Sequence, residues 1–348
     1  MKTTTLKAAA AFGLSALLAG SAAAQESQSK PVGYETLTVS NGFNYLGLRL
    51  HEAPVASDAA ATVNEGDAVI GVPDGVADAL VDGTSYLFEV TSGDAAGAVV
   101  TVVAFDAAAD TVTVSDAELT NDFFAGDAFT IRPQASLATV FGENNEAGLD
   151  AGFAGTGGAD QIWIADGEGG FDKYYYDGFN AAAGSASWSD ADSLEAVDAN
   201  AVNLFYTDGL ILVGDGTDGN TFVVSGSVKL TDTAFSLLGG FNYLSSVSPA
   251  GATIASMFGP SNEAGLSAGF AGTGGADQVW IPVGGSFEKY YYDGFNAGAG
   301  AAAWSNADSL EAVDPAAVSF DDASGFVLVN DGAAKMATAG VPDFYSTL

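Results

Sequence analysis

The chain has 348 residues, of which 44 are Asp or Glu and nine are Lys or Arg, so its formal net charge is −35. This charge excludes nucleic acid as a partner, because phosphate binding needs clustered basic residues, and anionic lipid headgroups are repelled for the same reason. The chain has no Cys, which excludes disulfides and thiolate chemistry. Hydrophobic residues make up 48% of the chain, enough to build a substantial core.

The N-terminus has the pattern of a bacterial signal peptide. A short positive region precedes the apolar run at residues 8–20, and Ala22 and Ala24 fit the small-x-small pattern that signal peptidase reads. We therefore predict that residues 1–24 are removed by cleavage before Gln25. The expected location is extracellular or on the cell surface, with the periplasm as an alternative. No later stretch approaches the ~20 apolar residues of a spanning helix, so no transmembrane helix is predicted.

The mature chain would keep seven basic and 44 acidic residues, a net charge of −37. Solubility, a salty habitat and loops that collect divalent cations are three explanations of this acidity. Composition does not choose among them.

A long segment of the chain occurs twice. Residues 141–164 match residues 258–281 at 20 of 24 positions, and residues 171–198 match residues 287–314 at 23 of 28. The motif "KYYYDGFNA" is identical in both copies and begins at Lys173 and at Lys289. The chain is therefore a tandem duplication.

The two copies differ by an insertion. Both open with "GFNYL", at Gly42 and at Gly240, but the spacing here is 81 residues longer than in the matched blocks. The extra residues contain "SYLFEV", "GAVVTVVAF", "DTVTVSD" and "DAFTIRP", β-branched or aromatic runs separated by Gly and Asp turns, which predict a small β module. The predicted parts are a signal peptide at 1–24, a first β repeat at 25–50 and 134–224, the inserted module at 51–133, and a second β repeat at 225–348.

Alternation with a period of two predicts strands through most of the repeats. In "DQIWI", Ile162 and Ile164 point to one side while Gln161 and Trp163 point to the other. A Gly-rich loop and "FDKYYY" follow, which predicts a β-hairpin. We expect no more than one or two helical turns, in "SLATVFG" and "DSLEAVD". With 45 Gly, the predicted fold is all-β: tandem β-sandwich or partly closed barrel units with an inserted small β module.

Several motifs follow one another in order: "GFNYL", then "YLFEVTSG", "DTVTVSD" and "GDAFTIRP", then "ADQIWI", "FDKYYY" and "GLILV". In this order the chain resembles an uncharacterised family of exported bacterial all-β proteins, which have a "GfN" opening strand, an "SG…G…TV…GD.F.I.P" module and aromatic "YY" hairpins. The resemblance implies a surface or secreted location and no known activity, and it assigns no catalytic residue. The close repetition of the aromatic hairpin departs from the family pattern.

The repeated aromatic residues are the candidate binding residues. Alternation would place Tyr174 and Tyr176 on one face of the strand and Tyr175 on the other, so at least one tyrosine of each triad is expected to face solvent. Exposed Tyr and Trp stack on sugar rings or seat a partner protein, whereas cross-strand packing is the structural alternative. The candidates are Lys173, Tyr174, Tyr175, Tyr176 and Trp188 in the first copy, and Lys289, Tyr290, Tyr291, Tyr292 and Trp304 in the second.

The two lysines of the motif have a structural and a functional interpretation. Lys173 and Lys289 alternate with the triads, on the same face as Tyr175 and Tyr291. A cation over a tyrosine ring, or an ion pair with a cross-strand Asp, would explain them. Binding of a ligand carboxylate is the alternative.

No cofactor, metal site or catalytic residue is predicted. Calcium remains an alternative because "GDGTDGN" places Asp215, Asp218 and Asn220 in one turn, although Gly and Asp dominate ordinary turns. His51, the single His, occurs in one copy only, and no feature selects a carboxylate pair among the 44 acids. We therefore do not expect an enzyme.

The predicted function is that of a non-catalytic secreted or cell-surface β-repeat protein. It would act in surface structure or in glycan or protein binding through its duplicated aromatic hairpins, with itself, a surface glycan or an extracellular protein as partner. The alternatives are an outer-membrane β-barrel and a carboxylate-dependent glycoside-active enzyme.

Overall fold

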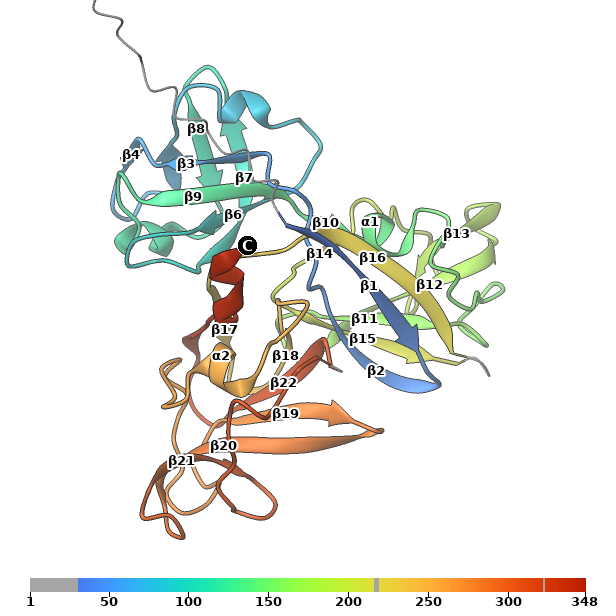
Figure 1. Cartoon of the computed structure of the whole chain (residues 1–348). Coiled ribbons are helices and arrows are strands. Elements are labelled where there is room, and N and C mark those ends of the chain that lie inside the picture. The colour runs from blue at the N-terminus through green and yellow to red at the C-terminus, as the bar shows by residue number, and fades with distance from the viewer. Residues whose placement is uncertain (1–30, 216–218, 322) are drawn as a thin grey trace, which may run out of the picture. The chain divides into compact units, whose positions relative to one another are not determined.

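The computed structural model describes residues 31–215, 219–321 and 323–348, so the predicted signal peptide lies outside the described residues. The all-β prediction is confirmed, because the described chain consists of antiparallel strands and turns with only short helices (Figure 1). No helix in these ranges has the length and apolar character needed to cross a bilayer.

The first repeat combines a five-stranded sheet with a two-stranded ribbon. Its main strands are β1 (Val32–Val39), β2 (Gly42–Gly47), β11 (Gln161–Ala165), β12 (Phe171–Asn180), β13 (Ser185–Asp190), β15 (Gly209–Gly214) and β16 (Asn220–Ser227). The sheet has the strand order β13-β12-β11-β15-β2, and β1 pairs with β16 to form the ribbon. A minor pair, β10 (Ala135–Ser136) with β14 (Asn203–Leu204), lies beside the short helix α1 (Leu137–Phe141).

The second repeat has the same topology. Its elements are β17 (Thr233–Leu237), β18 (Gly240–Ser245), α2 (Ile254–Phe258), β19 (Gln278–Val283), β20 (Ser286–Asn296), β21 (Ala301–Asn306), β22 (Gly325–Asn330), β23 (Lys335–Ala339) and the C-terminal 3-10 helix η3 (Asp343–Thr347). The sheet order is β21-β20-β19-β22-β18, and β17 pairs with β23. The repeat thus includes both ribbon strands, and the predicted start of the second repeat at residue 225 falls inside β16.

Each ribbon packs on one face of its sheet and makes a two-layer sandwich. In the first repeat Leu37, Val39 and Phe222 of the ribbon are buried in the same hydrophobic cluster as Ile162 and Leu212 of the sheet. The cluster continues into the second repeat through Phe235, Val279 and Leu328. The two repeats therefore share one core.

Each helix is capped at its N-terminus and ends after five residues at a glycine with a positive φ, Gly142 for α1 and Gly259 for α2. Ser136 caps α1 and Thr253 caps α2, each in a reciprocal capping box with the third helical residue. The segment "DSLEAVD" forms no helix, contrary to the sequence expectation. Leu194 has a φ of 60° and its carbonyl accepts a hydrogen bond from Asn180 Nδ2 at 3.1 Å, which together hold a turn.

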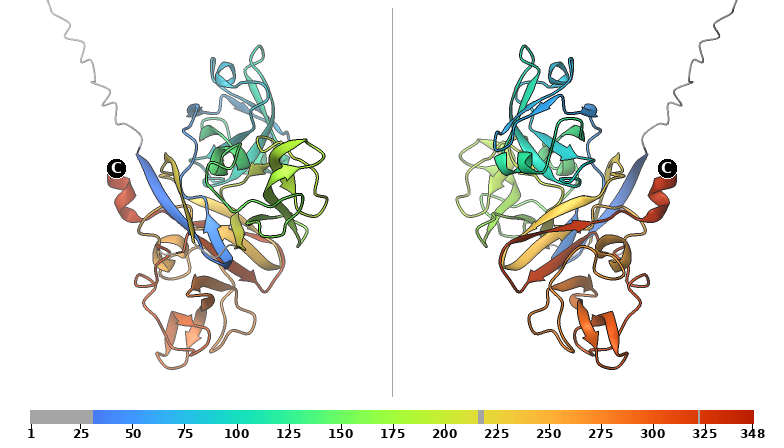
Figure 2. Two further views of the ribbon diagram at one scale, coloured as in Figure 1. Left: turned by 90° about the vertical axis from the view of Figure 1, so that its right-hand side faces the viewer. Right: turned by 90° about the vertical axis from the view of Figure 1, so that its left-hand side faces the viewer.

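The inserted segment forms a sheet and a core of its own (Figures 1 and 2). Its strands are β3 (Ala56–Ala59), β4 (Thr62–Val63), β5 (Val69–Gly71), β6 (Tyr86–Val90), β7 (Val99–Asp106), β8 (Thr111–Val114) and β9 (Ala128–Pro133), with 3-10 helices η1 (Ala77–Ala79) and η2 (Ala117–Asn121). The strand order is β3-β9-β6-β7-β8-β5-β4. Arg132 joins this sheet to the first repeat, since its Nη1 donates to Ser227 Oγ at 3.2 Å.

The two repeats meet through reciprocal contacts of equivalent residues. A Cβ on Gly209 would lie 2.9 Å from the backbone N and O of Leu244, and a Cβ on the equivalent Gly325 would lie 2.7–2.8 Å from backbone atoms of Leu46. Leu46 and Leu244 are themselves equivalent, so the junction has the self-complementary pattern of a two-fold contact. Both positions need glycine because any side chain would overlap the facing backbone.

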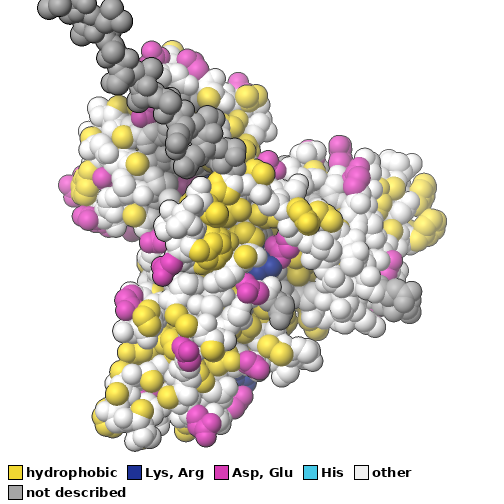
Figure 3. Space-filling view, in the orientation of Figure 1, with side chains coloured by type: hydrophobic (Ala, Val, Ile, Leu, Met, Phe, Trp, Pro, Cys, Tyr) yellow, Lys and Arg dark blue, Asp and Glu magenta, His cyan; other side chains and the backbone are white. Residues whose placement is uncertain are grey.

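The surface has few basic side chains. Acidic side chains are spread over the face seen in Figure 3, where few Lys and Arg are visible. Arg49 pairs with Glu35, Arg132 with Glu89 and Lys335 with Asp277. Three of the six Lys and Arg side chains in the described residues are thus neutralised by these pairs.

Candidate functional site

The structure places both tyrosine triads inside the repeats. Tyr175 and Tyr291 have no exposed surface, Tyr290 is 6% exposed, and Tyr174, Tyr176 and Tyr292 are partly buried. The expectation that at least one tyrosine of each triad faces solvent is therefore wrong.

A glycine-rich loop explains why the outer tyrosine is buried. Tyr174 and Tyr176 pack on the core face of β12, and Tyr175 points to the other face, where residues 150–160 cover it. A Cβ on Gly152 would lie 3.0 Å from the Tyr175 ring, and the Tyr175 hydroxyl donates to Asp177 Oδ2 at 3.1 Å. Burial, followed by the contact with Asp177, raises the pKa of Tyr175 to about 12.

Trp188 and Trp304 are also packing residues. Each is 1% exposed. Trp188 Nε1 donates to the carbonyl of Gly142 at 2.8 Å, and Trp304 Nε1 donates to the carbonyl of Gly259 at 2.9 Å. Side chains as buried as these cannot touch a ligand on the surface, so the binding role expected of both residues is wrong.

Lys173 and Lys289 lie over tryptophan rings rather than tyrosine rings. Lys173 Nζ is 5.2 Å from the ring centroid of Trp163, and Lys289 Nζ is 4.5 Å from that of Trp280, both within the range of a cation–π contact. Lys173 also pairs with Asp192 at 3.6 Å. Among the basic residues of the described chain, Lys289 alone makes no salt bridge or side-chain hydrogen bond.

Trp163 and Trp280 belong to a continuous series of eight aromatic rings, which we call the aromatic band. Neighbouring ring centroids are 5.0–6.4 Å apart, in the order Phe43, Trp163, Phe171, Tyr243, Tyr45, Phe287, Trp280 and Phe241. Rings at the same distance from the two ends of the band are equivalent residues of the two repeats, such as Phe43 and Phe241 or Trp163 and Trp280. At its centre Tyr45 and Tyr243 stack with an interplanar angle of 3°.

The band lies on the outer face of the two sheets. Cross-strand register places Lys173, Trp163, Ile211 and Tyr45 in one row across β12, β11, β15 and β2, whereas Ile162 points into the core. The terminal rings, Phe43 and Phe241, are 59% and 60% exposed, and the six others are partly exposed. The band is therefore accessible from solvent along its length.

A repeated asparagine holds each end of the band in position. Asn44 Nδ2 donates to the carbonyls of Ser40 and Leu212 at 2.7 and 3.0 Å, and its Oδ1 accepts from Ser40 N at 2.9 Å. These bonds fix the turn between β1 and β2, in which Gly42 has a φ of 89°. Asn242 makes the equivalent bonds in the second repeat. The "GFN" motif thus presents Phe43 and Phe241 at fixed places.

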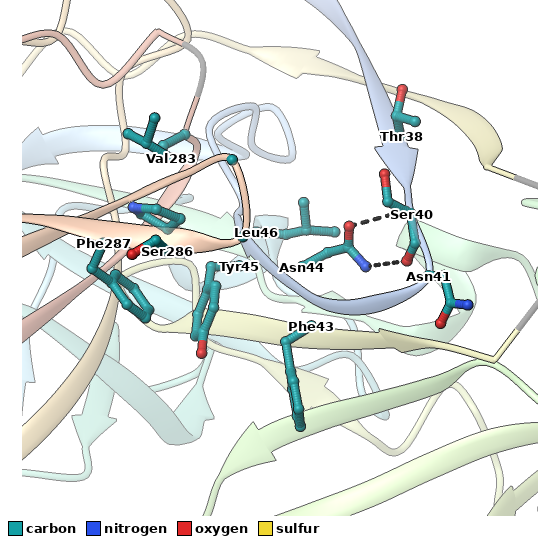
Figure 4. A pocket seen from close by; sticks show the side chains of 14 residues that line it. Thr38, Ser40, Asn41, Phe43, Asn44, Tyr45, Leu46, Val283, Ser286 and Phe287 are labelled. Carbon is teal, nitrogen blue, oxygen red and sulfur yellow. Dashed lines mark hydrogen bonds between the residues drawn. The ribbon is translucent and has the colours of Figure 1, made fainter.

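A pocket of about 730 Å³ opens beside the band, between β2 and the β19–β20 loop. Phe43, Tyr45 and Phe287 point to the same side in Figure 4, while the Asn44 side chain reaches back to Ser40. Asn41 and Ser286 add polar groups to the lining. The site combines aromatic surfaces with hydrogen-bonding groups, and none of the described residues that line it is charged.

The acidic residues next to the band lysines in sequence point to the other face of their strands. Asp172 lies opposite Ile164 and Glu288 lies opposite Ile281 in the strand register. Burial raises the pKa of Tyr45 and of Tyr243, so both central hydroxyls stay neutral and able to donate and accept hydrogen bonds at physiological pH.

Sequence reasoning missed the eight residues of the band. The sequence feature that could have revealed the band is the period of two in "DQIWI", which turns Trp163 away from the core residues Ile162 and Ile164. The same argument applies to Phe43 and Tyr45 in "GFNYL". The tyrosine triads were selected as candidates because three aromatic residues follow one another, but aromatic residues are also frequent in strands that are simply well packed.

The remaining candidates are the single histidine and the acidic turn. His51 is buried, and its burial, with Arg132 and Lys229 nearby, lowers its pKa well below the usual range. Of the acidic turn, Asp215 accepts a hydrogen bond from Gly158 N at 2.8 Å and Asn220 donates to Asp160 at 3.2 Å, while Asp218 lies outside the described residues. The described ranges contain no group of three or more His, Asp or Glu arranged to hold a metal ion.

Comparison with known proteins adds no relative. No protein family, curated protein or solved structure matches the chain.

Proposed function

We propose that this protein is an exported, non-catalytic binding protein of the cell surface or extracellular space, and that its aromatic band binds a glycan. The observation that supports this best is the continuity of the band, whose rings follow one another across both repeats at centroid distances of 5.0–6.4 Å. Contiguous exposed aromatic surface on a soluble protein marks an interaction site.

The chemistry of the band suits a sugar chain. A sugar ring has an apolar face that stacks on an aromatic ring and hydroxyl groups that need hydrogen-bond partners. Tyr and Trp offer both an apolar body and a polar tip, and Asn41 and Ser286 supply further partners in the pocket. A purely apolar ligand would leave these polar groups without partners, at a cost in binding.

The charge of the molecule favours a neutral glycan over an acidic one. The net charge is −35. A polyanionic glycan would meet long-range repulsion before any contact with Lys173 or Lys289. The lysines are better suited to donate hydrogen bonds to hydroxyl groups while they cover the tryptophan rings.

The duplication doubles the site along one line. Each repeat supplies four rings and one lysine, and the two sets meet at Tyr45 and Tyr243. A glycan long enough to cover both sets would gain binding energy from the second set without a new association step. We therefore expect longer oligosaccharides to bind more tightly than short ones.

A panel of neutral and acidic polysaccharides tests the proposal, with binding measured by affinity electrophoresis and calorimetry. We expect binding to a neutral polysaccharide and no turnover of it. Trp163→Ala or Trp280→Ala should weaken binding roughly tenfold, which corresponds to about 1.4 kcal/mol, and the double variant should lose more than either alone. Phe124→Ala, at a 49% exposed Phe in the loop between η2 and β9 of the insertion, is the control and should bind normally.

Two results would count against the proposal. One is the absence of binding to every neutral member of the panel. The other is binding that the double variant retains in full. Release of reducing sugar by the wild-type protein would show that the non-catalytic part is wrong. Export is tested separately, because protein recovered from the cell surface or the medium should begin at Gln25.

A further inference from the structure

Each repeat has a second exposed aromatic feature, remote from the band, which we call the phenylalanine clip. Phe153 stacks on Phe179 with ring centroids 5.8 Å apart, and the equivalent Phe270 stacks on Phe295 at 5.6 Å. The outer rings, Phe153 and Phe270, are 78% and 77% exposed, and their partners are 43% and 42% exposed. Side chains so large and so exposed bury little within the chain, yet both copies have them.

A buried carboxylate builds each clip. Asp177, which is 1% exposed, accepts hydrogen bonds at Oδ1 from the backbone N–H groups of Ala154 and Phe179, both at 2.9 Å. Asp293 does the same for Ala271 and Phe295. One side chain thus fixes the segments that hold both rings.

The clip also stores backbone strain. Ala154 and Ala271 each have a φ of 54°, which is unfavourable for a residue with a side chain. The same strained conformation directly follows the outer phenylalanine in both repeats. The rings are therefore held in place before any partner arrives.

The segments that form each clip contain no exposed charged side chain. Residues 151–159 and 178–189 meet at the first clip, and they contain no Asp, Glu, Lys or Arg. The same is true of residues 268–276 and 294–307 at the second clip. Over the whole sequence about one residue in eight is acidic. Depletion of charge together with exposed aromatic residues is typical of the centre of a protein–protein interface.

The clips lie away from the junction of the repeats. They are formed at β12–β13 and β20–β21, at the edge of each sheet opposite to the junction strands β2 and β18. Figure 3 shows an exposed group of hydrophobic side chains over the end of β12 and β13. Each chain therefore presents two equivalent apolar tips.

We propose that the clips join copies of this chain to one another, clip against clip. The uncharged tips are the places where two molecules of charge −35 approach with the least repulsion. A sugar is a poor occupant, because the carboxylate oxygens of Asp177 are already bonded to Ala154, Phe179 and Tyr175 and most residues of the surrounding segments are Gly or Ala.

Two clips on one chain lead to linear assemblies rather than closed dimers. A self-complementary contact joins two molecules, and a second contact on each molecule continues the series. Each contact is small, so association is weak and depends on protein concentration. High salt should promote it, because it screens the acidic surfaces.

The assembly proposal is tested by measuring the mass of the mature chain in solution. Weight-average mass, measured by analytical ultracentrifugation up to about 1 mM protein, should rise with concentration, and electron microscopy should show linear chains. Phe153→Ser with Phe179→Ser removes one clip, and the mass should then stop at that of a dimer. Removing both clips should leave a monomer. An excess of the one-clip variant should shorten wild-type chains by capping their ends.

Phe124→Ser changes an exposed Phe outside the clips and should assemble as the wild type does. Circular dichroism checks that each variant is folded. A wild-type chain that stays monomeric over the whole concentration range, at low and at high salt, would overturn the proposal. Variants that lack both clips and still assemble as the wild type does would also overturn it. The glycan proposal is independent, since band and clip variants share no residue.

Discussion

Every residue of "KYYYDGFN" makes a defined contact, and the contacts recur in both repeats. Lys173 lies over Trp163, the tyrosines pack in the core or beneath a loop, and Asp177 fixes the clip. At the end of the motif Asn180 Nδ2 donates to Ser189 Oγ at 2.8 Å. Structural constraints of this kind explain why the motif is identical in two copies whose flanks differ.

Asp208 is one residue at which the two copies differ in charge. It lies at the junction, where the second repeat has Ser324, and burial raises its pKa to about 6. In the unfolded chain its pKa is near 3.8, so the folded state binds more protons between these values and stability falls as pH rises through about 4 to 6. We predict that Asp208→Asn stabilises the protein at pH 7–8 and has little effect near pH 4.

The expected gain at pH 7 is about 1–2 kcal/mol, because one pKa unit corresponds to about 1.4 kcal/mol and solvent screens part of the effect. Urea denaturation at several pH values measures it. Asp74→Asn, at an exposed side chain, makes the same change in net charge and is the control for it. A destabilised Asp208→Asn at pH 7 would contradict the assigned cause.

At the scale of elements, the strands follow from alternation, but what covers each face does not. The sequence pattern correctly predicts the β11–β12 hairpin and the main strands β6 to β9 of the insertion. It does not reveal that residues 150–160 cover Tyr175, or that β2 and β18 meet at the junction, because both depend on contacts between distant segments. The aromatic band is a product of these contacts and was missed for that reason.

The junction strands depend on glycine. Gly325→Ala would place a Cβ 2.7–2.8 Å from the backbone of Leu46, and backbone cannot move aside as a side chain can. We predict a loss of about 2–3 kcal/mol in the free energy of unfolding. Gly274→Ala, where nothing lies within 4 Å, should change it by less than about 0.5 kcal/mol. Equal midpoints for the two variants in urea denaturation would show that the junction is looser than described.

At the scale of the whole molecule, the two repeats share one hydrophobic core, and the inserted sheet has another. The sharing explains why a five-stranded sheet and a ribbon suffice for each repeat. All four Trp lie in the repeats, so tryptophan fluorescence reports on them and not on the insertion.

Because the repeats share a core, they should unfold together. We predict a single transition in tryptophan fluorescence during thermal or urea unfolding, since separation of the repeats would expose Leu244 and Phe326 to water. Two resolved fluorescence transitions would mean that each repeat is stable alone and that the junction contributes little.

The central claim is that the aromatic band is the binding surface, and the four indole N–H signals of the protein in ¹⁵N-resolved NMR test it most directly. Trp163 and Trp280 are partly exposed members of the band, whereas Trp188 and Trp304 are 1% exposed and serve as internal controls. Signals are assigned with single Trp→Phe variants, and each neutral oligosaccharide of the panel is titrated in turn. We predict that a binding oligosaccharide shifts the signals of Trp163 and Trp280 and leaves those of Trp188 and Trp304 in place. Binding that leaves the first pair unmoved would contradict the account.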